Sequence, residues 1–190
     1  EMYSFTGTAG QRLYFDGISG STSIDATLVS PSGVTLINFA NVNSNRGPIS
    51  LLESGEYQLR IDGSGNTTGD YSFRLSDLAT ATDLSLDTIV NGTLEGQESN
   101  LFQFEGTAGQ QLHIEGLSDA FDGYFYLYGP NNQQLAQVVF TSFGEITLAQ
   151  SGTYYLAADS FRNTTVDYSF QVITPSTSTT ALTLGNTISD

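Results

Sequence analysis

The sequence predicts an all-β protein: two tandem antiparallel β-sandwich domains of jelly-roll-like form, followed by a C-terminal strand that could be donated to a neighbour. Three observations predict this fold. Apolar and polar residues alternate with a period of two, turn-forming sequences separate the alternating runs, and the motifs of the first half return in the same order in the second half. No segment combines helical apolar spacing with capping residues.

The alternating runs predict strands that bury one face and expose the other. The clearest of them lie at residues 12–16, 57–61 and 71–75. In the first run, Leu13 and Phe15 would face a core, while Tyr14 and Asp16 would face solvent. Between the runs stand Gly-Thr-Ala-Gly, Pro-Ser-Gly and Gly-Ser-Gly-Asn, which are turn-forming sequences. Many short strands in each half indicate an antiparallel sandwich.

Four motifs occur twice at a nearly constant offset. The pairs are residues 3–13 and 102–112, 28–33 and 127–132, 54–57 and 151–154, and 70–73 and 167–170. Repetition at a fixed period indicates one structural unit used twice. We therefore expect four pairs of residues to occupy matching buried positions: Phe5 and Phe104, Leu13 and Leu112, Tyr57 and Tyr154, and Phe73 and Phe170.

A third, partial copy of the unit follows the second. Its apolar pattern repeats an earlier one, with Leu182, Leu184 and Ile188 spaced like Leu84, Leu86 and Val90. We expect a first sandwich at residues 1–80 that lacks its first strand and a second, complete sandwich at 81–174. Residues 175–190 would be a Ser/Thr linker with the first strand of a following repeat.

The charge balance disfavours two classes of partner. The chain has 20 acidic residues against five basic ones, all arginine, for a net charge of -15. Nucleic acids and anionic membranes are disfavoured, because both bind through cationic side chains. The sequence contains no run of about 20 apolar residues, the length that a membrane-spanning helix needs. Acidic, lysine-free chains rich in Thr, Ser, Asn and Gly are typical of extracellular or cell-surface proteins.

The repeated motifs resemble a known family. Phe-x-Gly-Thr-Ala-Gly-Gln-x-Leu, Ser-Gly-x-Tyr-x-Leu and Asp-Tyr-Ser-Phe are similar to the bacterial pre-peptidase C-terminal (PPC) domain, especially to its tandem copies in large secreted proteins. The resemblance implies a jelly-roll-like sandwich with an accessory, adhesive or structural role. The motifs mark core strands and turns, and they carry no binding site.

The sequence offers little to a catalytic mechanism. It has no cysteine, and its one histidine, His113, lies on an alternating strand where it would face solvent. The matching residue of the first half is Tyr14. Cys-His and Ser-His-Asp arrangements are therefore not expected. A carboxylate pair could still serve a glycosidase, but 20 acidic residues make that pattern unselective. We expect a protein that is not an enzyme.

One loop is a candidate for calcium. Asp62, Ser64, Asn66 and Asp70 place oxygen atoms at positions 1, 3, 5 and 9 of a loop, as a hard cation requires. The matching loop of the second half has Phe161 at the third position. A hairpin connection that uses Asp, Gly and Asn for its turn is the alternative, and we favour it. No other cofactor is expected.

Three sequons could carry glycans: Asn66, Asn91 and Asn163 each begin Asn-x-Thr. Asn66 and Asn163 stand at equivalent positions of the two halves. Such triplets are also frequent by chance in a sequence rich in threonine.

The phase of the repeat suggests a function. A sandwich without its first strand has open edges, whereas a spare strand on a linker cannot bury Leu182, Leu184 and Ile188 by itself. Both deficits would disappear if the C-terminal strand of one molecule completed the first sandwich of the next. We therefore expect a homopolymer: a structural subunit of an extracellular fibre or surface array, joined by strands or as one tandem polypeptide. The alternatives are a carbohydrate- or surface-binding adhesive module and an accessory domain of a secreted peptidase.

Overall fold

A computed structural model describes residues 1–118, 121–141 and 143–175, and it confirms the all-β sandwich fold. The first seven strands are β1 (Met2–Gly7), β2 (Arg12–Ser19), β3 (Ile24–Val29), β4 (Thr35–Ala40), β5 (Arg46–Ser50), β6 (Gly55–Gly63) and β7 (Ser72–Asp77). They form a sheet of order β1-β6-β3-β4 that packs on a sheet of order β5-β2-β7. We refer to this pair of sheets as the first sandwich.

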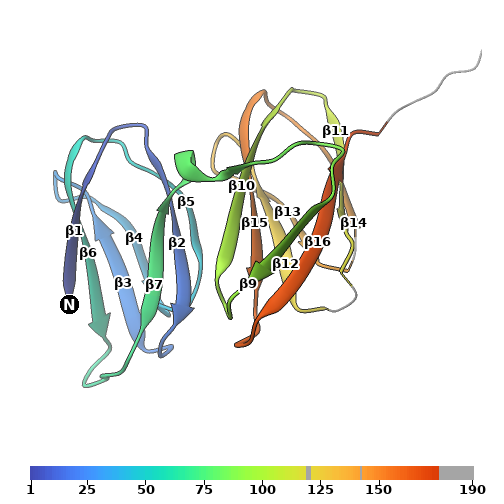
Figure 1. Ribbon diagram of the computed structural model, residues 1–190. Helices are drawn as coiled ribbons and strands as arrows, with labels where there is room; N and C mark the ends of the chain where they lie inside the picture. Colours follow the sequence, from blue (N-terminus) through green and yellow to red (C-terminus); the bar gives the residue numbers. More distant parts are fainter. Residues whose placement is uncertain (119–120, 142, 176–190) are drawn as a thin grey trace, which may run out of the picture.

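A short 3-10 helix, η1 (Leu78–Thr80), leads to the remaining strands. These are β8 (Thr82–Asp83), β9 (Val90–Leu94), β10 (Ser99–Gly106), β11 (Gln111–Gly116), β12 (Gly123–Tyr128), β13 (Gln134–Val139), β14 (Phe143–Thr147), β15 (Gly152–Ser160) and β16 (Val166–Ile173). They form sheets of order β13-β12-β15-β10-β8 and β14-β11-β16-β9, which we call the second sandwich. Figure 1 shows the two sandwiches side by side.

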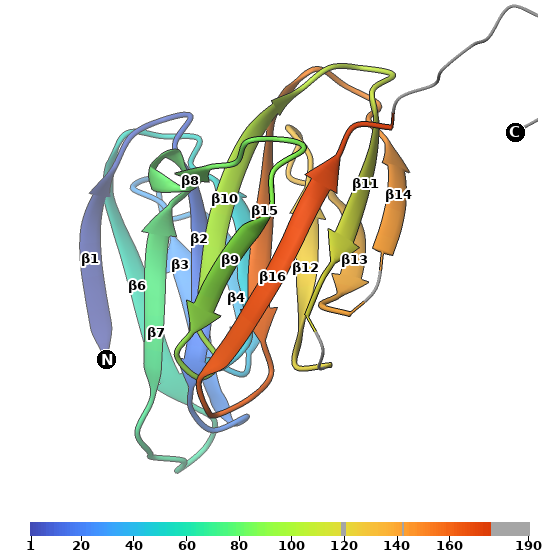
Figure 2. The same cartoon turned by 45° about the vertical axis from the view of Figure 1, so that its right-hand side comes forward.

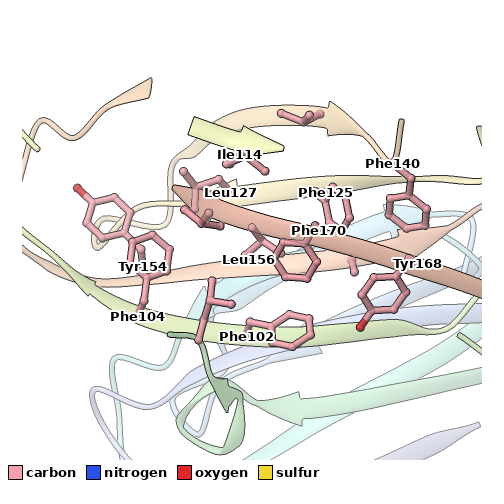
Figure 3. Packing of buried hydrophobic residues seen from close by; sticks show 14 of the residues in the cluster. Phe102, Phe104, Ile114, Phe125, Leu127, Phe140, Tyr154, Leu156, Tyr168 and Phe170 are labelled. Atoms are coloured by element: carbon pink, nitrogen blue, oxygen red, sulfur yellow. The ribbon is translucent and has the colours of Figure 1, made fainter. Parts of the chain in front are cut away.

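The aromatic residues fill the second sandwich. Phe125, Phe140 and Phe170 are fully buried, with the Phe125 centroid 4.5 Å from that of Phe140 and 4.7 Å from that of Phe170 (Figure 3). Alternate residues of β16 reach this core because successive side chains of a strand point to opposite faces. The first sandwich has a separate core around Phe15 and Tyr57.

The same contacts recur at the same places in both sandwiches. Phe5 stands opposite Tyr57, and Phe104 stands opposite Tyr154; in each pair the ring centroids lie 5.5 Å apart. Each tyrosine hydroxyl donates a hydrogen bond to a carbonyl four residues upstream. Glycine is required at the end of the strand paired with each tyrosine, because a Cβ on Gly7 or Gly106 would lie 2.8 Å from the ring of Tyr57 or Tyr154.

The eight expected core residues are not equally buried. All four in the second sandwich are buried, as are Leu13 and Tyr57 in the first. Phe5 and Phe73 are only half-buried. The expectation of matching burial is wrong at these two positions because they line an opening between β1 and β7 that nothing in the described part of the chain covers.

The prediction that Tyr14 and Asp16 of β2 face solvent is also wrong. Tyr14 is 1% exposed and Asp16 is fully buried. The sheet that contains β2 lies against the sheet of the second sandwich that contains β12 and β15. Tyr14 packs there with Tyr128 and Tyr155 in a third hydrophobic cluster. Sheet β5-β2-β7 is therefore covered on both faces.

The segment with Leu84 and Leu86 is not the continuous first strand that the repeat predicts. Leu84 and Leu86 lie outside the strands, and β8, just before them, is only Thr82–Asp83 and runs parallel to β10. The chain then leaves this sheet, and β9 pairs with β16 in the opposite sheet. Residues 84–89, between β8 and β9, therefore cross from one sheet to the other.

The buried ring of Tyr154 gives a test of the core. We expect Tyr154→Ala to lower the free energy of unfolding by about 3–5 kcal/mol, since it removes a fully buried aromatic ring. Tyr154→Phe keeps the ring and loses only the hydrogen bond to Gln150, so it should cost about 1 kcal/mol. Urea unfolding measures both. Equal losses in the two variants would contradict this assignment.

Candidate functional site

An apolar groove opens in the first sandwich between β1 and β7, which are the edge strands of its two sheets. Its volume is about 320 Å³. The side chains that make it apolar are Tyr3, Phe5, Leu13, Leu59, Phe73 and Leu75. Among the described residues, β1 pairs only with β6 and β7 pairs only with β2. Two unpaired backbone edges therefore border one apolar groove.

The corresponding place in the second sandwich is filled by its own chain. The Leu84 N–H donates to the Gln103 carbonyl, 2.7 Å away, and the Leu84 side chain is 6% exposed in the core. Leu86 and Val90 pack against the same core. Val90 then pairs with Phe170 of β16, so the segment closes both edges (Figure 2). The second sandwich therefore shows what closes this position in a complete unit.

The residues expected to fill the first groove lie outside the described part of the chain. Leu182, Leu184 and Ile188 belong to residues 176–190. Their role in strand exchange stays a prediction based on their spacing.

A buried polar cluster joins the two sandwiches. The Asp16 carboxylate accepts hydrogen bonds from the Ser99 N–H at 3.0 Å and the Ser99 hydroxyl at 2.9 Å. Arg74 forms an ion pair with Asp16 at 2.7 Å and also donates to the Ser99 carbonyl. Burial raises the pKa of Asp16, while the bonds from Ser99 and Arg74 oppose the rise. Charge and hydrogen bonds together hold β2, β7 and β10 in one arrangement.

Asp159 lies beside this cluster. Burial, followed by the charge of Asp16, raises the pKa of Asp159 to about 7. The Ser99 hydroxyl lies 3.4 Å from its carboxylate. Arg74 pairs with Asp16, and no arginine pairs with Asp159 among the described residues, so Asp159 is partly protonated near neutral pH.

Sequence reasoning missed this junction. Alternation assigns Tyr14 and Asp16 correctly to the face opposite the first core, but it does not say what covers that face. The second half does contain a signal for the junction. Tyr128 and Tyr155 occupy outward positions of β12 and β15, whereas the first half has Val29 and Gln58 at the matching positions. Outward aromatic residues on one sheet indicate that another sheet lies over it.

The calcium candidates are spread along an exposed loop. Asp62 pairs with Arg60, and the Ser64 hydroxyl donates to Asp25 at 3.2 Å. Asn66 and Asp70 are exposed. Within residues 1–118, 121–141 and 143–175, no three His, Cys, Asp or Glu side chains gather in a way that could hold a metal ion. The calcium site stays a prediction.

The other candidate residues lie on the surface. The sequon residues Asn66, Asn91 and Asn163 are all exposed, and their glycosylation stays a prediction. His113 is half-buried on the outer face of β11, with its Nδ1 atom 3.9 Å from the Glu145 carboxylate. Among the described residues, no helix has the length and apolar character needed to cross a bilayer.

Comparison with known proteins concerns the fold. No protein-family model and no curated protein matches the chain. Among solved structures, it is similar to PliG of Aeromonas hydrophila, a periplasmic inhibitor of g-type lysozyme, with 16% identity and a TM-score of 0.43 over 49% of this chain and 94% of that one. PliG of Salmonella Typhimurium is 21% identical, with a TM-score of 0.39 over 48% of this chain and 97% of that one.

A third similar structure is the pre-peptidase C-terminal domain of a Bacillus anthracis collagenase. It is 19% identical, with a TM-score of 0.42, and the match covers 48% of this chain and 93% of that one. It is a domain of the family that the sequence motifs resemble. Each match spans about half of this chain, and identities this low describe the fold alone.

The raised pKa of Asp159 predicts a pH dependence. A carboxyl group that titrates near 3.9 when unfolded and at about 7 when folded stabilises the folded state below pH 4. That contribution is lost as the pH rises through 7. We expect Asp159→Asn to gain stability relative to the wild type, by up to a few kcal/mol, between pH 4 and pH 8.

Urea unfolding at several pH values measures this difference. Asp70→Asn, on an exposed loop, is the matched control for the loss of one negative charge. Parallel curves for the wild type and Asp159→Asn would show that Asp159 keeps an ordinary pKa.

Proposed function

We propose that the chain is a structural subunit of an extracellular fibre or surface array, in which residues 180–189 of one molecule complete the first sandwich of the next. The observation that carries the proposal is the open apolar groove between β1 and β7. The equivalent groove is closed by residues 82–94 in the second sandwich. The chain also carries a second segment with the same apolar spacing.

The second sandwich supplies the template for this contact. Thr82 pairs with Phe102, so Thr180 would lie beside the matching residue, Tyr3. Leu182 would enter the core as Leu84 does. Val90 pairs with Phe170, so Ile188 would pair with Phe73 on β7. The donated segment would therefore begin parallel to β1, cross between the sheets and end antiparallel to β7.

Burial and backbone pairing both favour this arrangement. Burying an aliphatic side chain contributes about 1.5–3 kcal/mol. Leu182 should gain the full amount, because Leu84 is buried, whereas Leu184 and Ile188 should gain less, because Leu86 and Val90 are only partly buried. Pairing of the two edges adds backbone hydrogen bonds. Ordering of the linker opposes these gains, and its cost grows only slowly with length.

The geometry of such a contact produces a string of sandwiches. The donor and acceptor surfaces differ, so the contact is head-to-tail and need not close into a ring. A preceding segment of a longer polypeptide could fill the same groove and would give the same string. The acidic composition fits an extracellular location, and a scaffolding role requires no catalysis. The alternative role is that of an accessory domain of a secreted peptidase, which would need a catalytic domain outside this chain.

Changes in the tail should prevent polymerisation. We expect the wild-type chain to form filaments, and we expect Leu184→Asp and deletion of residues 181–190 to abolish them while both sandwiches stay folded. A charge at position 184 would be placed against an apolar core. Negative-stain electron microscopy and circular dichroism measure the two properties.

Thr183→Asp is the matched control. Its counterpart, Ser85, is exposed, so a charge there should leave the filaments intact. Normal filaments from the truncated chain would show that the tail does not make the contact.

A further inference from the structure

A cluster of aromatic rings lies on the surface beside the junction of the two sandwiches. Phe121 and Phe161 are 48% and 40% exposed, and their ring centroids are 5.1 Å apart. Tyr124 contacts both rings, at 5.5 and 5.9 Å, and Tyr126 lies 5.9 Å from Tyr124. We call these four residues the aromatic rim. Phe121, Tyr124 and Phe161 belong to none of the three hydrophobic clusters.

The sandwich fold does not require these rings. Tyr124 pairs with Asp159 as Asp25 pairs with Asp62 in the first sandwich. The residue there that matches Tyr126 is Thr27, and the residue that matches Phe161 is Ser64. The same backbone positions therefore carry small polar side chains in one sandwich and aromatic side chains in the other. The aromatic rim needs an explanation outside the packing of the fold.

The rim is held in a fixed arrangement. The Asp122 carbonyl accepts hydrogen bonds from the Ser160 hydroxyl at 3.1 Å and the Phe161 N–H at 3.3 Å. Arg162 pairs with the Asp122 carboxylate at 2.6 Å, and its guanidinium lies 5.0 Å from the Phe161 ring centroid. These contacts connect residues 121–126, at the start of β12, to the loop after β15 that carries Phe161. Little ordering entropy therefore remains to be lost when a ligand binds.

The rim borders a cavity between the two sandwiches. Tyr126 and Phe161 form part of its wall, and its volume is about 400 Å³, within the range of small-molecule sites. The other walls are mainly polar and include Asn45, Gln97 and Gln134. The cavity thus combines aromatic faces with amide donors and acceptors.

Tyr14 also lines this cavity, but it is only 1% exposed and its hydroxyl is closed off from solvent. The groups available to a ligand are therefore the aromatic rim and the amide side chains.

We propose that the aromatic rim and the junction cavity form a binding site for an uncharged polysaccharide. Sugar rings have apolar C–H faces that stack on aromatic side chains, and they have hydroxyl groups that bond to amide side chains. The net charge of -15 disfavours uronate or sulfated polymers. The site shares no residue with the groove between β1 and β7, so it does not depend on polymerisation.

The test begins with the full chain on a microarray of charged and uncharged oligosaccharides. Isothermal titration calorimetry with the strongest uncharged oligosaccharide then compares variants. We expect Phe161→Ala and Tyr124→Ala each to weaken the affinity at least about tenfold.

Tyr3→Ala is the matched control, since Tyr3 is another exposed aromatic residue and lies in the other groove. Its affinity should equal that of the wild type, even if it alters filament formation. The proposal fails if no uncharged oligosaccharide binds, if acidic oligosaccharides bind more strongly, or if the two rim variants bind like the wild type while remaining folded.

Discussion

A two-sheet sandwich needs its edge strands to be paired or covered, because unpaired strands present backbone N–H and C=O groups next to an apolar interior. The second sandwich meets this constraint with residues 82–94, which pair first with β10 and then with β16. The first sandwich has no such segment in the described part of the chain. The half-exposed rings of Phe5 and Phe73 and the apolar groove between β1 and β7 are consequences of that difference.

The junction between the sandwiches limits how freely they could move. Tyr14 packs against Tyr128, and Arg74 connects Asp16 on β2 to the Ser99 carbonyl on β10. A buried ion pair is weak support for stability, but removing one partner leaves an uncompensated charge. A subunit whose two sandwiches are held in this way could transmit a fixed angle to its neighbours. The same junction creates the cavity beside the aromatic rim.

Local patterns predicted much of the fold. Alternation identified strand faces, and the repeated motifs located Tyr57 and Tyr154, whose ring contacts and hydroxyl bonds match in the structure. Alternation failed at Tyr14, because it separates two faces of a strand without showing that a second sandwich covers one of them. It also failed for residues 84–86, since spacing alone cannot show that a segment crosses between sheets. The aromatic rim was missed because Phe161 follows β15, whereas the other three rings lie at or just before the start of β12, and only the fold brings them together.

The account depends most on the donated segment, and one cross-link tests it directly. The chain has no cysteine, so an introduced pair reports a single contact. Asp83 and Gln103 are paired and hydrogen-bonded in the second sandwich, and their counterparts are Ala181 and Ser4. Neighbouring strands lie about 4.8 Å apart, within reach of a disulfide.

Oxidation of the Ser4→Cys, Ala181→Cys variant should therefore give a ladder of covalent oligomers on a non-reducing gel. Gln58 is the partner of Ser4 on β6, on the side of β1 away from the groove. Gln58→Cys combined with Ala181→Cys should remain monomeric. Equal ladders from both pairs, or no ladder from the first, would contradict strand donation.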